Sequence, residues 1–182
     1  MKVVTLNIGI ATPWGMWLSS DFRLSRQTRR GGWVPLDDYW SPKHLSFSTV
    51  DGAALITYSG LGRIKGTVGD LGLRGKPDPD GMTANIHLDA GQEKEMDVSD
   101  WLAWTLHGES RTIDESIQHI RERAEATPGF RGFPHVFTVL CYIRGRGWLA
   151  QITNAKLVQD WYAHAPEDTF KVTARPIGPP ED

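Results

Sequence analysis

The sequence predicts an α+β domain made of two antiparallel sheets with helices packed on an outer face. Strand-like segments come first, two helical segments follow each other, and strand-like segments return at the end. This order lacks the alternation of strands and helices that a parallel, doubly wound sheet requires. The 182 residues, 40% of them hydrophobic, can bury a real core, so we expect a single domain spanning 1–182.

The first segment has the period-two pattern of a strand. Its apolar side chains alternate along the chain and fall on one face, at Val4, Leu6, Ile8 and Ile10. Residues 13–15 then predict a turn, and the apolar run 16–18 leads back toward Asp21. The two runs should pair as a hairpin that brings Asp21 near the start of the first strand.

A second hairpin is expected between two long loops. Arginines, two adjacent glycines and two prolines predict a solvated loop at about 22–42. Segments 44–49 and 53–58 flank an Asp-Gly pair at 51–52, which supplies the backbone freedom of a tight hairpin turn. The second loop, at about 66–95, is rich in glycine and proline, which predicts an excursion on the surface.

Two helices are expected next. Asp97 or Ser99 can cap a short helix that ends at Gly108. A longer helix should begin after Thr112, whose hydroxyl can cap it while Glu115 reaches back in a capping box. The apolar residues of this helix recur at helical spacing and should be buried, namely Ile113, Ile117, Ile120 and Ala124.

Strands return after this helix, at 136–143, 148–153, 157–162 and 170–174, joined by glycine-rich or Asn-Ala-Lys turns. Cys141 is the single cysteine, and it lies in the apolar run of the first of these strands. We expect it to behave as a small buried hydrophobic residue. A single cysteine also excludes an intrachain disulfide.

The composition argues against several classes of partner. Lys and Arg total 20 against 22 Asp and Glu, so no basic excess is available to bind nucleic acid or an anionic membrane. No secretory leader and no long apolar run are visible, which with the single cysteine predicts a cytoplasmic protein. The six histidines form no i,i+4 pair, and no phosphate-binding glycine motif precedes a helix. Neither a metal site nor a cofactor is expected.

The first hairpin resembles the start of a known family of hydrolases. From Thr5 to Arg23 the chain has a threonine, an alternating strand, a turn glycine at Gly15, an apolar run, Asp21 and a basic residue. This order and spacing are similar to those of proteasome β-type and HslV-type subunits, which are N-terminal-nucleophile (Ntn) hydrolases. Further on, 41–45 and 55–60 resemble the catalytic-lysine strand and the glycine turn of the same family.

The resemblance implies a four-layer αββα sandwich, assembly into rings, and hydrolysis of peptide or amide bonds. It implies Thr5 as nucleophile, Lys43 as electrostatic activator, Asp21 as the residue that orients Lys43, and the Gly60 N–H as a donor to the oxyanion. In that chemistry the α-amine of the threonine takes up the hydroxyl proton. The neighbouring ammonium keeps this amine neutral.

Each of these residues also has a purely structural interpretation. Thr5 can be an ordinary strand threonine, and Asp21 can pair with Arg23 or cap a turn. Lys43 can be a solvated lysine on an edge strand, and Gly60 can serve only a turn. The sequence leaves these alternatives open.

Both ends of the chain bear on activity. Met1 to Val4 precede Thr5, so the α-amine of Thr5 becomes free only after processing. Residues 179–182 stand where the family has a further site segment, so we expect the C-terminal helical layer to be missing or reduced. An apolar sheet face left open in this way implies a homo-oligomer. Two functions follow: a threonine peptidase or amidase processed before Thr5, or a non-catalytic scaffold subunit of the same fold.

Overall fold

The structure is a computed structural model of the chain. It describes residues 7–12, 15–20, 23–27, 33–40, 42–73, 90–108, 110–143, 145–158 and 163–177. These residues form an α+β arrangement built mainly from antiparallel sheets, together with two α-helices. The predicted fold class is confirmed at this level, and the four-layer sandwich stays a prediction.

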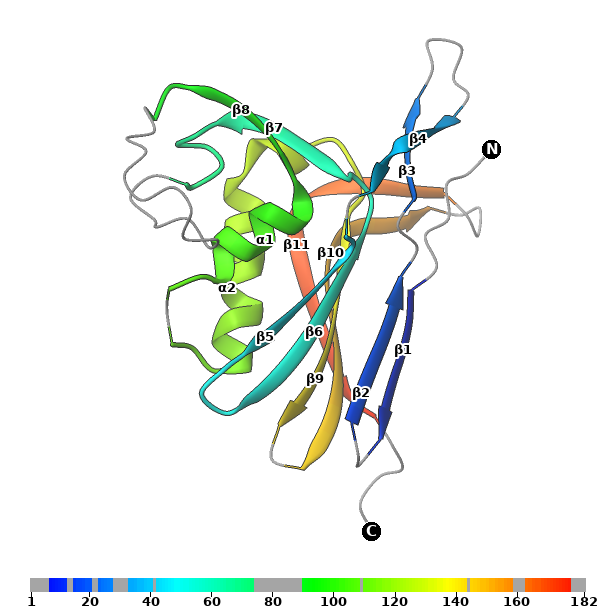
Figure 1. Cartoon of the computed structure of the whole chain (residues 1–182), viewed down its shortest axis with the longest axis vertical. Coiled ribbons are helices and arrows are strands. Elements are labelled where there is room, and N and C mark those ends of the chain that lie inside the picture. The colour runs from blue at the N-terminus through cyan, green and yellow to red at the C-terminus, as the bar shows by residue number, and fades with distance from the viewer. Residues whose placement is uncertain are drawn as a thin grey trace.

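A five-stranded antiparallel sheet forms the centre of the molecule (Figure 1). Its strand order is β11-β10-β9-β6-β5. The strands are β5 (His44–Ser48), β6 (Gly52–Ser59), β9 (Val136–Ile143), β10 (Arg146–Val158) and β11 (Ala163–Pro176). The predicted hairpin turn at Asp51 joins β5 to β6, with Ser48 opposite Ala53.

Two helices cover one face of this sheet, on the left in Figure 1. They are α1 (Val98–Leu106) and α2 (Ile113–Ala126), and a 3-10 turn, η1 (Pro128–Phe130), follows α2. The predicted capping box is confirmed: Glu115 N donates to Thr112 Oγ1 at 3.2 Å, and Thr112 N donates to Glu115 Oε2 at 2.8 Å. The predicted apolar face is buried at Ile113, Ile117, Ile120 and Ala124. Neither of these helices has the length and apolar character needed to span a membrane.

The first predicted hairpin lies on the opposite face of the sheet, on the right in Figure 1. It consists of β1 (Asn7–Thr12) paired with β2 (Gly15–Ser20), and β2 contacts β5, β6 and β9. Gly9 faces the sheet, since a Cβ at this position would lie 3.6 Å from Leu140 Cδ2. In the described residues the order of layers is therefore helices, five-stranded sheet, hairpin.

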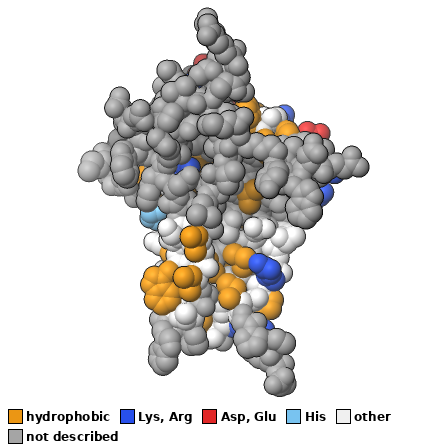
Figure 2. All heavy atoms as spheres, turned by 90° about the vertical axis from the view of Figure 1, so that its right-hand side faces the viewer, with side chains coloured by type: hydrophobic (Ala, Val, Ile, Leu, Met, Phe, Trp, Pro, Cys, Tyr) orange, Lys and Arg blue, Asp and Glu red, His pale blue; other side chains and the backbone are white. Residues whose placement is uncertain are grey.

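The outer side of this hairpin is apolar and open to solvent. Ile10 pairs directly with Trp17 across the two strands, and Ile8 lies two residues earlier on the same side. Ile10 is 53% exposed and Trp17 is 55% exposed. Figure 2 looks onto this side of the molecule, and hydrophobic side chains gather in its lower half. We call Ile8, Ile10 and Trp17 the outer apolar patch.

The predicted loop at about 22–42 is wrong where the structure describes that segment. Here β3 (Arg23–Gln27) pairs with β4 (Trp33–Trp40) in a two-stranded ribbon. Aromatic and β-branched residues favour a strand at 33–40. Pro35 is compatible with this strand because, in the described residues, β4 pairs along one edge only, and proline is tolerated in edge strands.

The expected excursion at 66–95 begins and ends in paired strands. β7 (Arg63–Thr67) pairs with β8 (Glu93–Asp97), so Thr67 lies opposite Glu93, and residues 74–89 are outside the described part. Asp97 occupies the N-cap position of α1, as predicted. Its carboxylate, however, accepts a hydrogen bond from Arg63 Nε at 2.8 Å and makes none to the helix.

β10 joins two strands that were predicted separately. It continues through Asn154, Ala155 and Lys156, where a turn was expected, with a shift of register between Thr153 and Ala155. The Thr153 hydroxyl accepts a hydrogen bond from the Ala155 N–H at 2.9 Å. Thr153 pairs with Lys171 and Ala155 with Pro166, so Asn154 alone lies against four residues of β11, 167–170. The irregularity is therefore accommodated as a bulge in β11, and β10 does not reverse.

Candidate functional site

Two of the four predicted site residues, Lys43 and Gly60, lie at the same end of the β5–β6 pair. Lys43 directly precedes β5, and Gly60 directly follows β6. Because His44 pairs with Thr57 in an antiparallel register, the two residues come together at one end of these strands. The other two predicted residues, Thr5 and Asp21, lie outside the described part of the chain.

Lys43 is buried, with 5% of its surface exposed. Its carbonyl accepts a buried hydrogen bond from Thr57 Oγ1 at 2.6 Å, which fixes the backbone at the start of β5. The alternative of a solvated edge lysine is therefore wrong, although β5 is an edge strand of the central sheet. Lysine is seldom buried without compensating interactions, because removal of its ammonium from water is costly. A buried lysine at a strand end is thus a candidate functional residue.

Gly60 has a positive φ of +117°, a conformation that other L residues seldom adopt. A Cβ at this position would lie 2.6 Å from His135 Nδ1 and 2.7 Å from the Pro134 carbonyl oxygen. The position thus requires glycine both for the backbone angle and for the close approach. The turn role of Gly60 is confirmed, and its role as an oxyanion donor stays a prediction.

His135, on which Gly60 rests, was considered in the sequence only as a possible zinc ligand. It is fully buried between the rings of Tyr58, Phe130 and Phe137, whose centroids lie 5.9, 4.9 and 4.5 Å from its own. Burial lowers the pKa of His135 to about 3, so the ring is neutral at physiological pH. His135 was not identified as a site residue from the sequence, and no local sequence signal indicates its contact with Gly60.

The backbone of His135 is fixed by the two residues of β10 at its register shift, Thr153 and Asn154. The His135 N–H donates to Asn154 Oδ1 at 2.7 Å, and Thr153 Oγ1 donates to the His135 carbonyl at 2.9 Å. Asn154 Nδ2 also donates to the Phe133 carbonyl at 3.0 Å. The same irregularity that the sequence suggested as a turn therefore holds the imidazole beneath the Gly60 turn.

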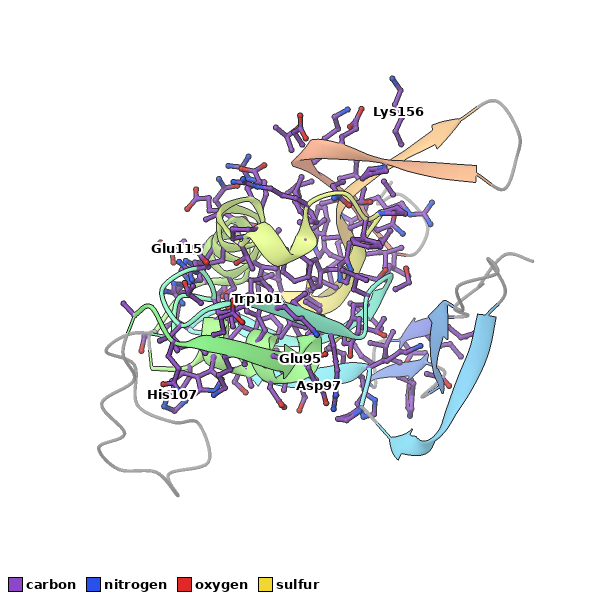
Figure 3. The ribbon with its side chains drawn as sticks, turned by 90° about the horizontal axis from the view of Figure 1, so that it is seen from above. Glu95, Asp97, Trp101, His107, Glu115 and Lys156 are labelled. Atoms are coloured by element: carbon purple, nitrogen blue, oxygen red, sulfur yellow. The ribbon has the colours of Figure 1, made fainter. Side chains whose placement is uncertain are left out.

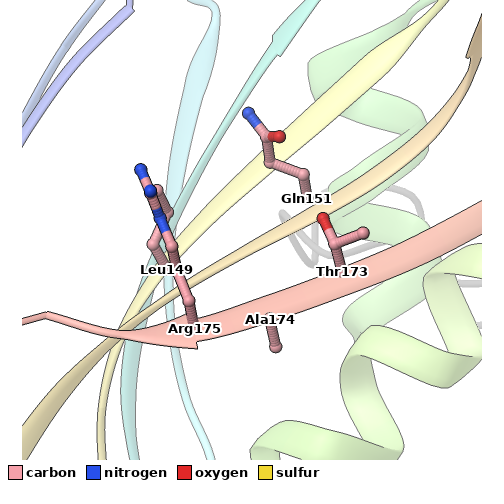
Figure 4. Close-up of a pocket in the computed structure, with 5 residues that line it drawn as sticks. All are labelled: Leu149, Gln151, Thr173, Ala174 and Arg175. Atoms are coloured by element: carbon pink, nitrogen blue, oxygen red, sulfur yellow. The ribbon is translucent and has the colours of Figure 1, made fainter.

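Neither the single cysteine nor the hollow beside β10 has the features of a catalytic site. Cys141 is buried in β9, and burial, with smaller contributions from Asp114 and Asp51, raises the pKa of its thiol to about 11. It is therefore an inert core residue, as predicted, and no nucleophile. A shallow hollow of about 100 Å³ lies between β10 and β11 (Figure 4), lined by Leu149, Gln151, Thr173, Ala174 and Arg175. Its lining contains neither of the predicted residues that the structure describes.

No family model, curated protein or solved structure matches the chain. The fold and the site define an α+β protein with a five-stranded antiparallel sheet. A buried lysine lies at one end of that sheet, together with a glycine turn that packs against a buried histidine.

Proposed function

We propose that the chain is a proteasome-like Ntn hydrolase, a threonine peptidase or amidase that becomes active after removal of the residues before Thr5. The observation that carries this proposal is the burial of Lys43 at the sheet end where the Gly60 turn also lies. A buried lysine at the same sheet end as a turn that requires glycine is unusual for a purely structural strand end and is typical of functional sites.

The proposed chemistry divides the work among four residues. The Thr5 hydroxyl attacks the carbonyl carbon of an amide, and the freed α-amine of Thr5 takes up the hydroxyl proton. Lys43 favours the neutral amine and the alkoxide character of the hydroxyl through its positive charge, and Asp21 orients Lys43. The N–H of Gly60 donates to the oxyanion that develops on the substrate. The substrate class is therefore a peptide or a simple amide.

The first experiment asks whether Thr5 becomes the N-terminal residue and reacts. Intact-mass measurement of freshly expressed protein should give a species that begins at Thr5, and an electrophile that traps threonine nucleophiles should label it. Thr5→Ala should abolish both amide turnover and labelling. Thr12→Ala, in β1 of the same hairpin, is the matched control and should retain both. Unchanged turnover in Thr5→Ala would remove Thr5 from the mechanism.

The second experiment tests Lys43. Lys43→Met keeps the length of the side chain and removes its charge, and should lower kcat about 100-fold, the size of effect typical of a lost electrostatic group in an active site. Lys65→Met is the matched control, because Lys65 is an exposed lysine of β7 that pairs only at the surface with Glu95. Equal loss of activity in both variants would argue against a role for Lys43. Urea unfolding of each variant separates lost chemistry from lost stability.

A second candidate function is a non-catalytic scaffold subunit that assembles with copies of itself. The outer apolar patch favours it, because half-exposed Ile8, Ile10 and Trp17 side by side are unusual on a surface that meets only solvent. An intact mass that retains the residues before Thr5, combined with a stable oligomer in sedimentation, would support the scaffold over the enzyme.

A further inference from the structure

We propose that His135 is a pH-sensitive support for the Gly60 turn: the neutral ring holds the turn in position, and the protonated ring displaces it. The proposal concerns regulation of the site, and only its consequence for catalysis rests on the proposed function. The coupling itself belongs to the fold and can be measured on the uncut chain.

The imidazole is fully buried, with three aromatic rings packed around it. In the described residues, neither Nδ1 nor Nε2 has a hydrogen-bond partner. A neutral imidazole carries one donor and one acceptor, whereas an imidazolium carries two donors and a charge. Burial without a hydrogen-bond partner is unfavourable for the neutral ring and far more unfavourable for the charged ring. Protonation therefore requires the ring to reach water or a hydrogen-bond acceptor.

The Gly60 turn is the movable part of this enclosure. Gly60 is itself exposed to solvent, yet its backbone lies so close to Nδ1 that a Cβ would come within 2.6 Å of it. The other neighbours belong to regular elements or are tied to them: Tyr58 in β6, Phe130 in η1 and Phe137 in β9. The backbone of His135 is likewise fixed through Thr153 and Asn154. Displacement of the exposed turn is therefore the least costly way to admit water to Nδ1.

Among the described residues, no charged side chain offsets the burial of His135. β6 contributes the phenol of Tyr58, which is titratable but uncharged at neutral pH, whereas η1 and β9 contribute phenylalanines. β10 contributes the uncharged Thr153 and Asn154. Burial alone accounts for the low pKa of His135, so the folded pKa lies near 3 against an ordinary value of 6.5.

The direction of the effect follows from these two values. A base whose pKa is lowered by folding favours the closed form above pH 6.5, and this preference weakens as the pH falls from 6.5 toward 3. If the ring titrates normally when the turn is displaced, the equilibrium constant for opening should rise about fiftyfold between pH 6.5 and pH 4.5.

The test follows the backbone amides of Gly60 and Leu61 by relaxation-dispersion NMR in the full-length, uncut chain, which measures the population of the displaced turn. The ratio of displaced to closed turn should rise about fiftyfold between pH 6.5 and 4.5 if this turn is linked to His135. In His135→Phe this ratio should be independent of pH over the same interval. His107→Phe, at the end of α1, is the control and should behave as the wild type.

Persistence of the pH dependence in His135→Phe would overturn the proposal. If that variant does not fold, the ring protons of wild-type His135 supply a second readout. A ring that titrates near 6.5 while the Gly60 amide stays unchanged would also overturn it, whereas joint movement of ring and amide would support it. Because none of these measurements involves turnover, they give the same answer whether or not Thr5 is a nucleophile.

Discussion

The layers on the two faces of the central sheet both contain tryptophan, but they bury it to very different degrees. On the helix face, Trp101 of α1, labelled in Figure 3, is fully buried. Its ring meets that of Phe130 edge to face, with centroids 4.9 Å apart. On the hairpin face, Trp17 of β2 is 55% exposed and lies opposite Ile10. The comparison shows that a large apolar side chain is buried only where two layers enclose it. In the described structure the helices and the sheet enclose Trp101, whereas no layer covers the outer side of the hairpin.

The hairpin face is packed on its inner side alone. A Cβ at Gly9 would lie 3.6 Å from side-chain atoms of both Leu140 of β9 and Leu18 of the same hairpin, whereas Ile8 and Ile10 point outward. A two-stranded hairpin is marginal by itself and takes most of its stability from the sheet beneath it. We therefore expect the helix face to dominate folding stability and the outer apolar patch to influence association.

The largest expected effect is on the helix face. Trp101→Ala removes a fully buried indole and leaves a cavity, so the free energy of unfolding should fall by about 3–5 kcal/mol. Trp17→Ala, the same substitution on the hairpin face, should cost less than about 1 kcal/mol, because much of that side chain is already in contact with water. Urea unfolding of both variants at one protein concentration makes the comparison, and similar losses would show that the two faces are equally well packed.

The parts of the fold that could be predicted from sequence are those set by local chemistry. The capping box needs only the Thr112 hydroxyl and the Glu115 carboxylate three residues later, and both hydrogen bonds are present. The turn at Asp51 likewise follows from its own residues. The strands within 22–42 and the continuation of β10 through Asn154 could not be predicted, because pairing with the next strand outweighed the local turn signals.

The candidate site divides in the same way. Gly60 could be singled out because Ser59 and Gly60 at the end of a predicted strand are a local signal for a turn. The positive φ of Gly60 agrees with this prediction. The burial of Lys43 and the contact between Gly60 and His135 depend on how β5, β6 and β9 come together. No local pattern encodes such a contact, so His135 could not be recognised before the structure was known.

A smaller effect is expected at the start of α2, on the closed face. Thr112→Ala removes the side-chain half of the capping box and should cost about 1 kcal/mol of unfolding free energy at neutral pH. The hydrogen bonds from the Thr112 backbone and side chain lower the pKa of Glu115 below 4.5. The contribution of this carboxylate is therefore present above pH 4.5 and is lost as the pH falls further, so the difference from the wild type should shrink in acid.

The control for this prediction is Thr169→Ala, because Thr169 is an exposed threonine of β11. It should change stability by less than about 0.5 kcal/mol. Thermal or urea unfolding at pH 7 and at acid pH provides the measurement, and equal losses for Thr112→Ala and Thr169→Ala would contradict the role assigned to the cap.

The smallest effect on stability, and the clearest on association, is expected in the outer apolar patch. Ile10→Thr keeps a β-branched side chain suited to a strand and replaces a half-exposed apolar group with a polar one. Its unfolding free energy should stay within about 0.5 kcal/mol of the wild type. If the patch is where copies of the chain meet, sedimentation at micromolar concentration should show the wild type as an oligomer and Ile10→Thr shifted toward the monomer.

The control is Val50→Thr, an equally conservative change at a solvent-exposed valine of the β5–β6 turn, which should leave the oligomer intact. A monomeric wild type would instead mean that the hairpin face is open to solvent in the native protein, and the contrast between the two faces would then be one of packing alone.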